Sequence, residues 1–321
     1  MALARRCLPV PFQLSLVLVV CVGPMDAAVA QGVARAPAVA WRPRSSLQGS
    51  LVLLAVRPSV ADSVTGMQGE LAGEPLHFEP VGDEFRALGA VPLEARDSVA
   101  ARIVIERAGG ASDTVIAPLR VRHRRAPRER LHAAPEFVQP PESLAERIRT
   151  ERELVGEIKR RAHETPRLWR EPFVRPRAAA VTGTFGVVRI FNGVVRSRHL
   201  GVDFAGERGA PVRATNRGVV AFVGDLYYSG KTIFIDHGAG LVTGYLHLSS
   251  ALVAPGDTVA CGQLIGRVGA SGRVTGPHLH WLADYGNLSV DPLDLITVDL
   301  NAPLSFGPVP EAKSRAGPQP D

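Results

Sequence analysis

The sequence GPHLHW, residues Gly276–Trp281, places His278 and His280 one residue apart, directly after a glycine-rich turn. Side chains two residues apart on an extended strand point to the same face of a sheet. Both imidazoles can therefore face one cleft, where one ring can bind a metal ion and the other can carry protons. An isolated pair of this kind is more commonly two partly exposed strand histidines, so the surrounding sequence has to distinguish the two interpretations.

Length and composition favour two modest β-rich domains joined by connectors. The chain has 321 residues, 45% of them hydrophobic, with 32 glycines and 26 prolines that favour turns and short strands. The net charge of +6 is carried almost entirely by arginine. Such a charge suits nucleic acid, an anionic membrane surface or an anionic cell-wall polymer. Because the arginines are scattered and not interleaved with aromatic residues, we expect no nucleic-acid partner.

Residues 1–30 have the pattern of a signal peptide. Arg5 and Arg6 precede the apolar run Leu14–Val22, which is too short to span a bilayer, and the small-residue pattern AVA at Ala28–Ala30 predicts cleavage before Gln31. We therefore expect an exported protein of the periplasm or cell envelope, with no stable membrane span after cleavage. The shortness of the apolar run disfavours a retained anchor.

The cysteines indicate whether an exported chain would carry a lipid anchor or an internal disulfide. Cys21 could carry a lipid, but the bulky Val19 and Val20 before it make a poor lipidation signal. Signal cleavage leaves Cys261 as the single cysteine, so the mature chain is expected to have no internal disulfide. We expect Cys261 to be a small buried residue and not a nucleophile.

Residues 31–125 are predicted to form an immunoglobulin-like β-sandwich. Short apolar runs alternate with turn residues such as Gly82 and Gly109, at a spacing typical of antiparallel strands. His77 is expected to be a lone structural histidine on a strand, and the region shows no catalytic cluster. The predicted strands lie at residues 50–56, 76–78, 85–88, 101–105, 114–116 and 119–122.

Residues 126–178 are predicted to be a linker that contains one helix. The sequence SLAE at Ser143–Glu146 resembles a capping box, and the helix is expected to run to about His163, a solvated residue near its C-terminus. Pro166 ends the helix. The segment Arg167–Phe173 is expected to be extended and to attach the helix to the next domain.

Residues 179–298 are predicted to form a second, glycine-rich antiparallel β domain. Hairpin turns are expected at Pro255–Asp257 and at Ser271–Gly272. Residues 299–321, rich in proline, glycine and charge, are expected to be a disordered tail. The strands expected in this domain lie at residues 218–223, 232–236, 241–248, 263–269 and 278–283.

Five of the nine histidines lie in this second domain, namely His199, His237, His247, His278 and His280. Asp203 comes four residues after the first of them, so on a strand the two share a face, and Gly201 between them lets the backbone bend. A carboxylate and two imidazoles would supply the three protein ligands that catalytic zinc typically has. Bound zinc lowers the pKa of water to roughly 7, and the remaining histidines could move protons.

Three sequence blocks of this domain resemble the signature motifs of lysostaphin/LytM-type zinc metallopeptidases. They are RHLGVDF at Arg198–Phe204, DHG at Asp236–Gly238 with TGYLHLS at Thr243–Ser249, and GPHLHW at Gly276–Trp281. The resemblance covers about residues 181–295 and implies a duplicated-hybrid-motif-like antiparallel β fold. The preceding helix and the segment after it resemble the lead-in of exported members that carry an N-terminal immunoglobulin-like domain.

The resemblance implies a role for each matching residue. His199, Asp203 and His280 match the family's zinc ligands, with one Zn²⁺ per catalytic domain. His247 and His278 match the catalytic pair that orients or deprotonates water and stabilises the tetrahedral intermediate.

Other motif positions are expected to support the site. His237 is interpreted as structural or as a support for the ligands, and Thr243 and Tyr245 as lining the cleft or supporting the catalytic pair. The departures from the family pattern are mild, such as Leu200 where a small polar residue is common and Ser271 where threonine is frequent. None of them removes a ligand or a catalytic histidine.

The implied function is zinc-dependent hydrolysis of peptide bonds in bacterial peptidoglycan, in stem peptides or cross-links, during cell-wall remodelling. Peptidoglycan is then the expected partner, together with a regulatory protein of the cell envelope. The alternative is a non-catalytic LytM-type regulator that binds the wall or activates amidases, because such regulators share the fold. Inactive members usually lack some of the five site residues, so their retention here favours activity.

Overall fold

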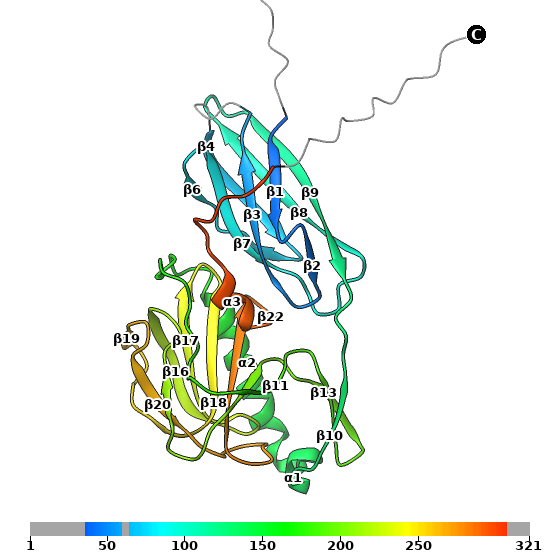
Figure 1. Ribbon diagram of the computed structural model, residues 1–321, viewed down its shortest axis with the longest axis vertical. Helices are drawn as coiled ribbons and strands as arrows, with labels where there is room; N and C mark the ends of the chain where they lie inside the picture. The colour runs from blue at the N-terminus through cyan, green and yellow to red at the C-terminus, as the bar shows by residue number, and fades with distance from the viewer. Residues whose placement is uncertain (1–35, 60–63, 307–321) are drawn as a thin grey trace, which may run out of the picture. The chain divides into compact units, whose positions relative to one another are not determined.

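The computed structural model describes residues 36–59 and 64–306, and antiparallel strands make up most of its regular secondary structure (Figure 1). This confirms the predicted β class. The signal peptide predicted for residues 1–30 lies outside the described residues, as does the end of the predicted tail, residues 307–321. In the described part of the chain, no helix is long and apolar enough to cross a membrane.

The first β region consists of two sheets around one apolar core. Along β8, Ala101, Ile103 and Ile105 are buried while the residues between them are more exposed, so one face of that sheet packs inward. The assignment of this region to the immunoglobulin class stays a prediction. One sheet has the order β1 (Ala38–Arg42), β3 (Leu51–Arg57), β7 (Glu84–Ala90) and β6 (Glu79–Val81), and the other β2 (Ser45–Leu47), β9 (Ser112–Arg122), β8 (Ser98–Arg107), β4 (Val64–Leu71) and β5 (Glu74–Pro75).

Strand β3 has an unbroken apolar sequence because both of its faces are buried. Val52 and Leu54 belong to the core between the two sheets, whereas Leu51 and Leu53 belong to the core of the second β region. A strand covered on both faces reads as a continuous hydrophobic run and not as an alternating one. The two β regions therefore share packing through this strand.

Several predicted strands differ in detail from the observed ones. Residues 76–78 are not a strand and connect β5 to β6, whereas residues 114–116 and 119–122 form the single strand β9, which pairs with β8 along its length. The predicted turn at Pro255–Asp257 does not close a hairpin, and that at Ser271–Gly272 lies in a longer connection whose ends, Gly269 and His278, form a single antiparallel bridge. The strands after these turns, β19 and β21, pair with other strands of the sheet.

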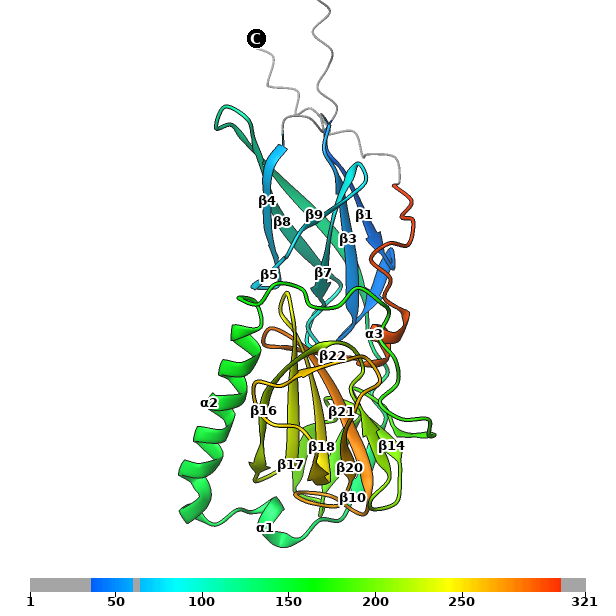
Figure 2. The same cartoon turned by 90° about the vertical axis from the view of Figure 1, so that its left-hand side faces the viewer.

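The predicted linker helix is confirmed as α2 (Ala145–Arg161), which lies beside β16 (Figure 2). The predicted capping box is wrong, since Ser143 falls inside a 3₁₀ turn, η2 (Glu142–Leu144), and no side chain caps the start of α2. A short helix, α1 (Pro135–Val138), precedes the turn. The helix is attached to the second β region by Glu151, whose Oε2 accepts a hydrogen bond of 2.7 Å from the backbone N–H of Tyr227.

The segment after the helix is extended, as predicted, and two of its side chains are buried. Trp169 and Phe173 pack into the core of the second β region, and the backbone N–H of Leu168 donates to the carbonyl of His237 at 2.9 Å. Large aromatic side chains of this kind carry much of a core's buried apolar area. The linker is therefore an integral part of the second β region's core.

The second β region is built on one large antiparallel sheet, in which β14 and β18 flank β21. Its main path runs β11 (Val181–Gly183), β14 (Val202–Ala205), β21 (His278–Tyr285), β18 (Leu241–Ala251), β17 (Gly230–Gly238), β16 (Gly218–Leu226) and β19 (Thr258–Val259), with β15 (Pro211–Arg213), β20 (Leu264–Val268) and β22 (Leu288–Val290) paired beside it and α3 (Leu293–Thr297) after it. The strands predicted for this region are all observed, in their main extent.

A separate three-stranded sheet joins the linker to this region. Strand β10 (Arg128–Leu131), from the predicted linker, pairs in parallel with β12 (Val188–Phe191), which pairs with β13 (Val195–Arg198). The polar sequence of β10 gives little strand signal by itself. Its conformation depends on the partner strand, which lies far away in the sequence.

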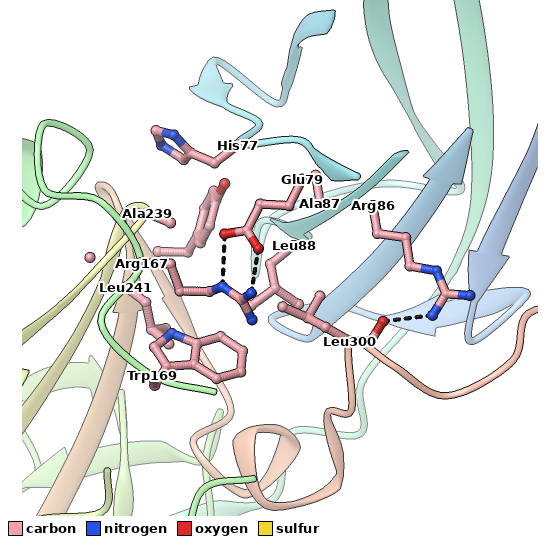
Figure 3. A pocket seen from close by; sticks show the side chains of 12 residues that line it. His77, Glu79, Arg86, Ala87, Leu88, Arg167, Trp169, Ala239, Leu241 and Leu300 are labelled. Atoms are coloured by element: carbon pink, nitrogen blue, oxygen red, sulfur yellow. Dashed lines mark hydrogen bonds and ion pairs between the residues drawn. The ribbon is translucent and has the colours of Figure 1, made fainter. Parts of the chain in front are cut away.

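Two histidines described above as isolated lie together where the first β region contacts α2 and β18. His163 is not solvated: its Nε2 lies 3.0 Å from Glu74 Oε2, and its Nδ1 lies 2.8 Å from His77 Nε2. A cavity of about 20 Å³ lies close by. At its edge Arg167 pairs with both carboxylate oxygens of Glu79 (Figure 3). The expectation of a lone His77 and an exposed His163 was wrong because the partner of each is distant in the sequence.

Two further expectations differ from the structure. The tail predicted to be disordered from residue 299 is described to Phe306, and the Arg86 guanidinium donates to the carbonyls of Leu300 and Ala302 at 2.6 and 2.9 Å. Cys261 is exposed and not buried. Its small size and apolar neighbours suggested a core position, but it lies in the turn between β19 and β20, where the side chain points outward.

The carboxyl of Asp294 in α3 predicts a pH-dependent stability. It accepts a hydrogen bond of 3.0 Å from the backbone N–H of Leu51, and burial, with Asp291 nearby, raises its pKa from 3.8 to about 6. Because the folded state binds this proton more tightly, the stabilisation is complete below the unfolded pKa and is lost as pH rises through about 6.

Asp294→Asn should therefore match the parent chain near pH 4 and exceed it by about 1–3 kcal/mol in unfolding free energy at pH 7.5. Urea unfolding at both pH values measures the difference. Asp97→Asn, at a carboxyl whose side chain is 93% exposed, is the control and should show no such divergence. If the difference in unfolding free energy between Asp294→Asn and the parent were the same at both pH values, the raised pKa of Asp294 would be contradicted.

Candidate metal centre

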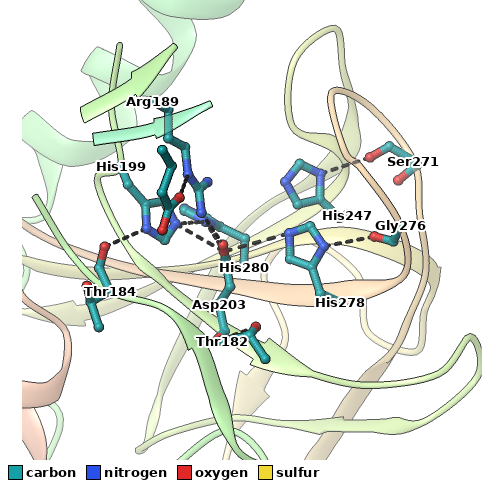
Figure 4. Close-up of polar contacts among 11 residues, drawn as sticks. Thr182, Thr184, Arg189, His199, Asp203, His247, Ser271, Gly276, His278 and His280 are labelled. Atoms are coloured by element: carbon teal, nitrogen blue, oxygen red, sulfur yellow. Dashed lines mark hydrogen bonds and ion pairs between the residues drawn. The ribbon is translucent and has the colours of Figure 1, made fainter. Parts of the chain in front are cut away.

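Strand pairing brings three of the predicted site residues together. β14 pairs with β21 so that Asp203 lies opposite His280, and His199 lies three residues before the start of β14. Figure 4 shows these side chains pointing toward one another, with His247 and His278 close by. The five residues predicted from the sequence thus gather at one place in the structure.

The atoms suited to metal binding converge on one point. Asp203 Oδ1 lies 3.0 Å from His199 Nε2 and 2.8 Å from His280 Nδ1, and the two nitrogens lie 3.0 Å apart. All three residues are buried. Within residues 36–59 and 64–306, this is the one group of three or more His, Cys, Asp or Glu side chains with a geometry that could hold a metal ion.

Hydrogen bonding defines which atom of His199 faces the group. Its Nδ1 lies 2.7 Å from the backbone carbonyl of Thr184, and a carbonyl oxygen only accepts, so Nδ1 carries the proton. The neutral ring then presents the Nε2 lone pair to the carboxylate of Asp203, which is also an acceptor. Two facing acceptors repel each other, so this arrangement requires a proton or a metal cation between them.

Two glycines allow the group to close. A Cβ on Gly201 would lie 2.5 Å from His280 Nε2 and 2.6 Å from the carbonyl oxygen of Trp281. A Cβ on Gly183 would lie 2.5 Å from Asp203 Oδ2. Glycine is therefore required at both positions by close approach, although neither has a positive φ.

The remaining pair, His247 and His278, is oriented by backbone carbonyls. His247 Nδ1 donates to the Ser271 carbonyl, and His278 Nδ1 donates to the Gly276 carbonyl, each at 2.8 Å. Nε2 is the other nitrogen of each ring, and that of His278 lies 3.7 Å from Asp203 Oδ1. The ring centroids of the pair are 5.0 Å apart.

The backbone of His247 is strained. Its φ is 61°, a left-handed conformation that costs a non-glycine residue about 1–2 kcal/mol. The pairing of β17 with β18 jumps from Lys231–Leu248 to Ile233–Tyr245, so His247 lies in a β-bulge. Bulges re-aim side chains next to active sites, and this one directs the imidazole of His247 toward His278 and His280.

Burial sets the charge of the group. Burial lowers the pKa of His247 to about 3 and that of His280 to about 4, so both rings are neutral at neutral pH. Burial alone would raise the pKa of Asp203, but the adjacent imidazoles of His199 and His280 outweigh that effect and hold the pKa well below its usual range. The group therefore offers one carboxylate, the neutral imidazole of His280 and the Nε2 atom of His199.

A cleft of about 350 Å³ opens beside the group, and several of the residues that line it were not expected from the sequence. Arg189 donates to Asp203 Oδ2 and lies 3.4 Å from Glu129 Oε2. The alternating sequence VRIF followed by Asn-Gly was a hairpin signal that could have located β12 and its arginine. Nothing in the linker sequence pointed to a role for β10. The newly located lining residues are Glu129, Leu131, Thr182, Arg189, Phe191 and Arg273.

Three further residues singled out from the motifs do not line this cleft. His237 is fully buried, with its Nδ1 donating to the carbonyl of Arg217 at 2.7 Å and its Nε2 lying 2.8 Å from Thr243 Oγ1. Tyr245 is also fully buried, and its hydroxyl lies within hydrogen-bonding distance of Thr215 and Thr243. These residues form a polar network inside the core, behind the sheet that carries the site.

Comparisons with known proteins point to one family. The model of peptidase family M23 matches residues 197–292. A Pseudomonas aeruginosa protein assigned to peptidase M23 has a solved structure that is 26% identical, with a TM-score of 0.61 over 78% of this chain and 94% of that one. Residues 197–292 therefore carry a peptidase M23 domain.

Curated relatives are similar over part of the chain, as two examples show. The DD-carboxypeptidase/endopeptidase Mpg of Neisseria meningitidis serogroup B is 42% identical over 97 residues, which cover 30% of this chain and 22% of that protein. The peptidoglycan DD-endopeptidase ShyA of Vibrio cholerae serotype O1 is 48% identical over 83 residues, covering 26% and 19%. The match therefore spans about a fifth of the length of each relative.

The packing of Gly201 predicts that Gly201→Ala destabilises the fold. The new Cβ meets a backbone carbonyl and the His280 ring, neither of which can move freely, so we expect a loss of about 1–3 kcal/mol in unfolding free energy. Gly276→Ala is the matched control, because a Cβ there meets nothing within 4 Å. Thermal unfolding of both variants tests this, and equal melting temperatures would contradict it.

Proposed function

We propose that the chain is a zinc-dependent endopeptidase that hydrolyses peptide bonds in bacterial peptidoglycan. The observation that carries the proposal is the convergence of His199, Asp203 and His280, with the imidazoles of His247 and His278 close by. The match of residues 197–292 to peptidase family M23 supports peptide hydrolysis. The names of the relatives Mpg and ShyA support peptidoglycan as the substrate.

The donor set fits zinc. Two imidazole nitrogens and one carboxylate oxygen are a common catalytic zinc set that leaves a fourth position open. Tetrahedral coordination at these bond lengths separates ligand atoms by about 3.3 Å, and the observed separations of 2.8–3.0 Å need only a slight expansion. With a cation between them, the facing acceptor atoms of His199 and Asp203 would no longer repel each other. A zinc ion would supply Lewis acidity and a water of lowered pKa.

The chain's own residues would hold that ion and move protons. Arg189 fixes the free oxygen of Asp203, which leaves Oδ1 to face the two imidazoles. His278 lies nearest to the group, so its Nε2 is the closer acceptor for a proton leaving water held there. The proton would then pass to the leaving amine, while the Gly276 and Ser271 carbonyls stabilise the charge on whichever ring carries it.

Ligand and catalytic substitutions should separate metal binding from turnover. We expect His280→Ala and Asp203→Ala to lose both zinc and hydrolysis. His278→Ala should retain zinc and lower kcat by roughly 10²–10⁴-fold, the usual contribution of a proton-transferring group. Metal content and mass spectrometry of products from purified sacculi measure the two effects.

The control for this series is His123→Ala, at a histidine whose side chain is 69% exposed in the first β region. It should retain zinc and full activity. Full hydrolysis of sacculi by zinc-free His280→Ala would refute the proposal. A parent protein with no metal and no released peptides would favour the non-catalytic regulator instead.

Metal removal should also lower stability. A ligand that binds the folded state alone adds about 2.7 kcal/mol at a free concentration 100 times its dissociation constant. Chelation should therefore lower the melting temperature of the parent chain, and added zinc should restore it. Asp203→Asn, which weakens the carboxylate ligand, should show a much smaller shift, and equal shifts in both proteins would place the metal elsewhere.

A further inference from the structure

We infer that Arg273 forms a subsite of the cleft that binds a carboxylate of the substrate peptide. The inference rests on the proposed peptidase function, since it concerns a substrate held beside His247 and His278. Arg273 lines the same cleft as these two histidines. It lies in the connection between β20 and β21, which sequence reasoning interpreted only as a turn.

Two aromatic rings hold the guanidinium of Arg273. Its central carbon lies 4.4 Å from the ring centroid of Phe191 and 4.8 Å from that of Tyr228. Arginine stacks on aromatic faces in this way and keeps its planar edge of N–H donors available. Phe191 belongs to β12 and Tyr228 to the turn between β16 and β17, so separate parts of the fold converge on this one side chain.

The guanidinium of Arg273 has no acidic partner in the described part of the chain. No carboxylate lies within ion-pairing distance, and no hydrogen-bond acceptor is in reach of its side-chain nitrogens, in residues 36–59 and 64–306. The neighbouring Arg189 is different, because it is paired with both Asp203 and Glu129. Burial and the positive charge of Arg189 both lower the pKa of Arg273, and an incoming anion would relieve these two effects.

The backbone around Arg273 is rigidly placed. Its N–H donates to the Tyr228 carbonyl at 2.9 Å, and a Cβ on Gly272 would lie 2.5 Å from the N of Gly230. Ser271 accepts from the Lys231 N–H at 2.9 Å through its hydroxyl. The Ser271 carbonyl is also the group that orients His247, so the carboxylate subsite and the catalytic imidazole are fixed by the same three residues of chain.

Charge in the cleft favours an anionic occupant. Arg189 and Arg273 balance Asp203 and Glu129, so a dication at the His–Asp–His group leaves the cleft positively charged. A guanidinium pairs with a carboxylate in a bidentate manner that an uncharged amide cannot reproduce. The substrate class is therefore a peptide that carries a free carboxylate near the scissile bond.

The test compares one substrate in acidic and amidated form. Cross-linked muropeptide dimers are assayed before and after carbodiimide conversion of their carboxyls to carboxamides. The zinc-loaded parent chain should cleave the acidic form with kcat/KM roughly 10- to 100-fold higher, mainly through KM. Arg273→Gln should reduce this preference to about twofold or less, and Arg273→Lys should retain part of it.

The matched control is Arg208→Gln, which removes the same charge from an exposed arginine that does not line the cleft. It should keep the parent's preference. A parent chain that cleaves both forms equally, or an Arg273→Gln variant that keeps the full preference, overturns the subsite and leaves the peptidase function standing. Failure of the parent to cleave either form or intact sacculi overturns the proposed function itself.

Discussion

The carboxylate of Asp203 is the constraint around which the second β region is arranged. A buried charge is costly unless each of its acceptor positions is matched. Oδ1 faces two imidazoles and Oδ2 accepts from Arg189, so both oxygens are engaged. A side chain at position 183 would clash with Asp203 Oδ2, and one at position 201 would clash with the His280 ring, which explains the glycine at each position. The pairing of β14 with β21 then fixes the carboxylate opposite His280.

The other side of the cleft depends on irregular backbone. The bulge at His247 directs its imidazole to the carbonyl of Ser271. Arg273, whose guanidinium packs on Tyr228, follows Ser271 by two residues. The left-handed φ of His247 is the cost of this arrangement, whereas Gly230 and Gly272 adopt their positive φ values without such strain. Strain of this kind persists only where the surrounding structure determines it, and here tight packing between Gly230 and Gly272 does so.

The first β region and the linker contribute directly to the structure around the site. β3 is buried on both faces, and Trp169 and Phe173 belong to the core of the second β region. Arg124, which follows β9, is paired with Asp291 at 2.9 Å, and β10 provides Glu129 and Leu131 to the cleft wall. A substrate in the cleft would therefore contact segments that precede the M23-matching region in the sequence.

The sequence alone determined the β class and most strands of the second region, and its resemblance to lysostaphin/LytM-type peptidases indicated the three candidate metal ligands and the two histidines beside them. Strand periodicity and short-range motifs carry that information, because residues two or four apart on a strand share a face whatever surrounds them. Tertiary structure decided the rest. The buried pair of His163 and His77, the ordered segment at Leu300, the pairing of β10, and the positions of Arg189 and Arg273 all depend on partners far away in the sequence. Such long-range contacts leave no local pattern, so only the folded chain shows that the cleft has a positively charged wall.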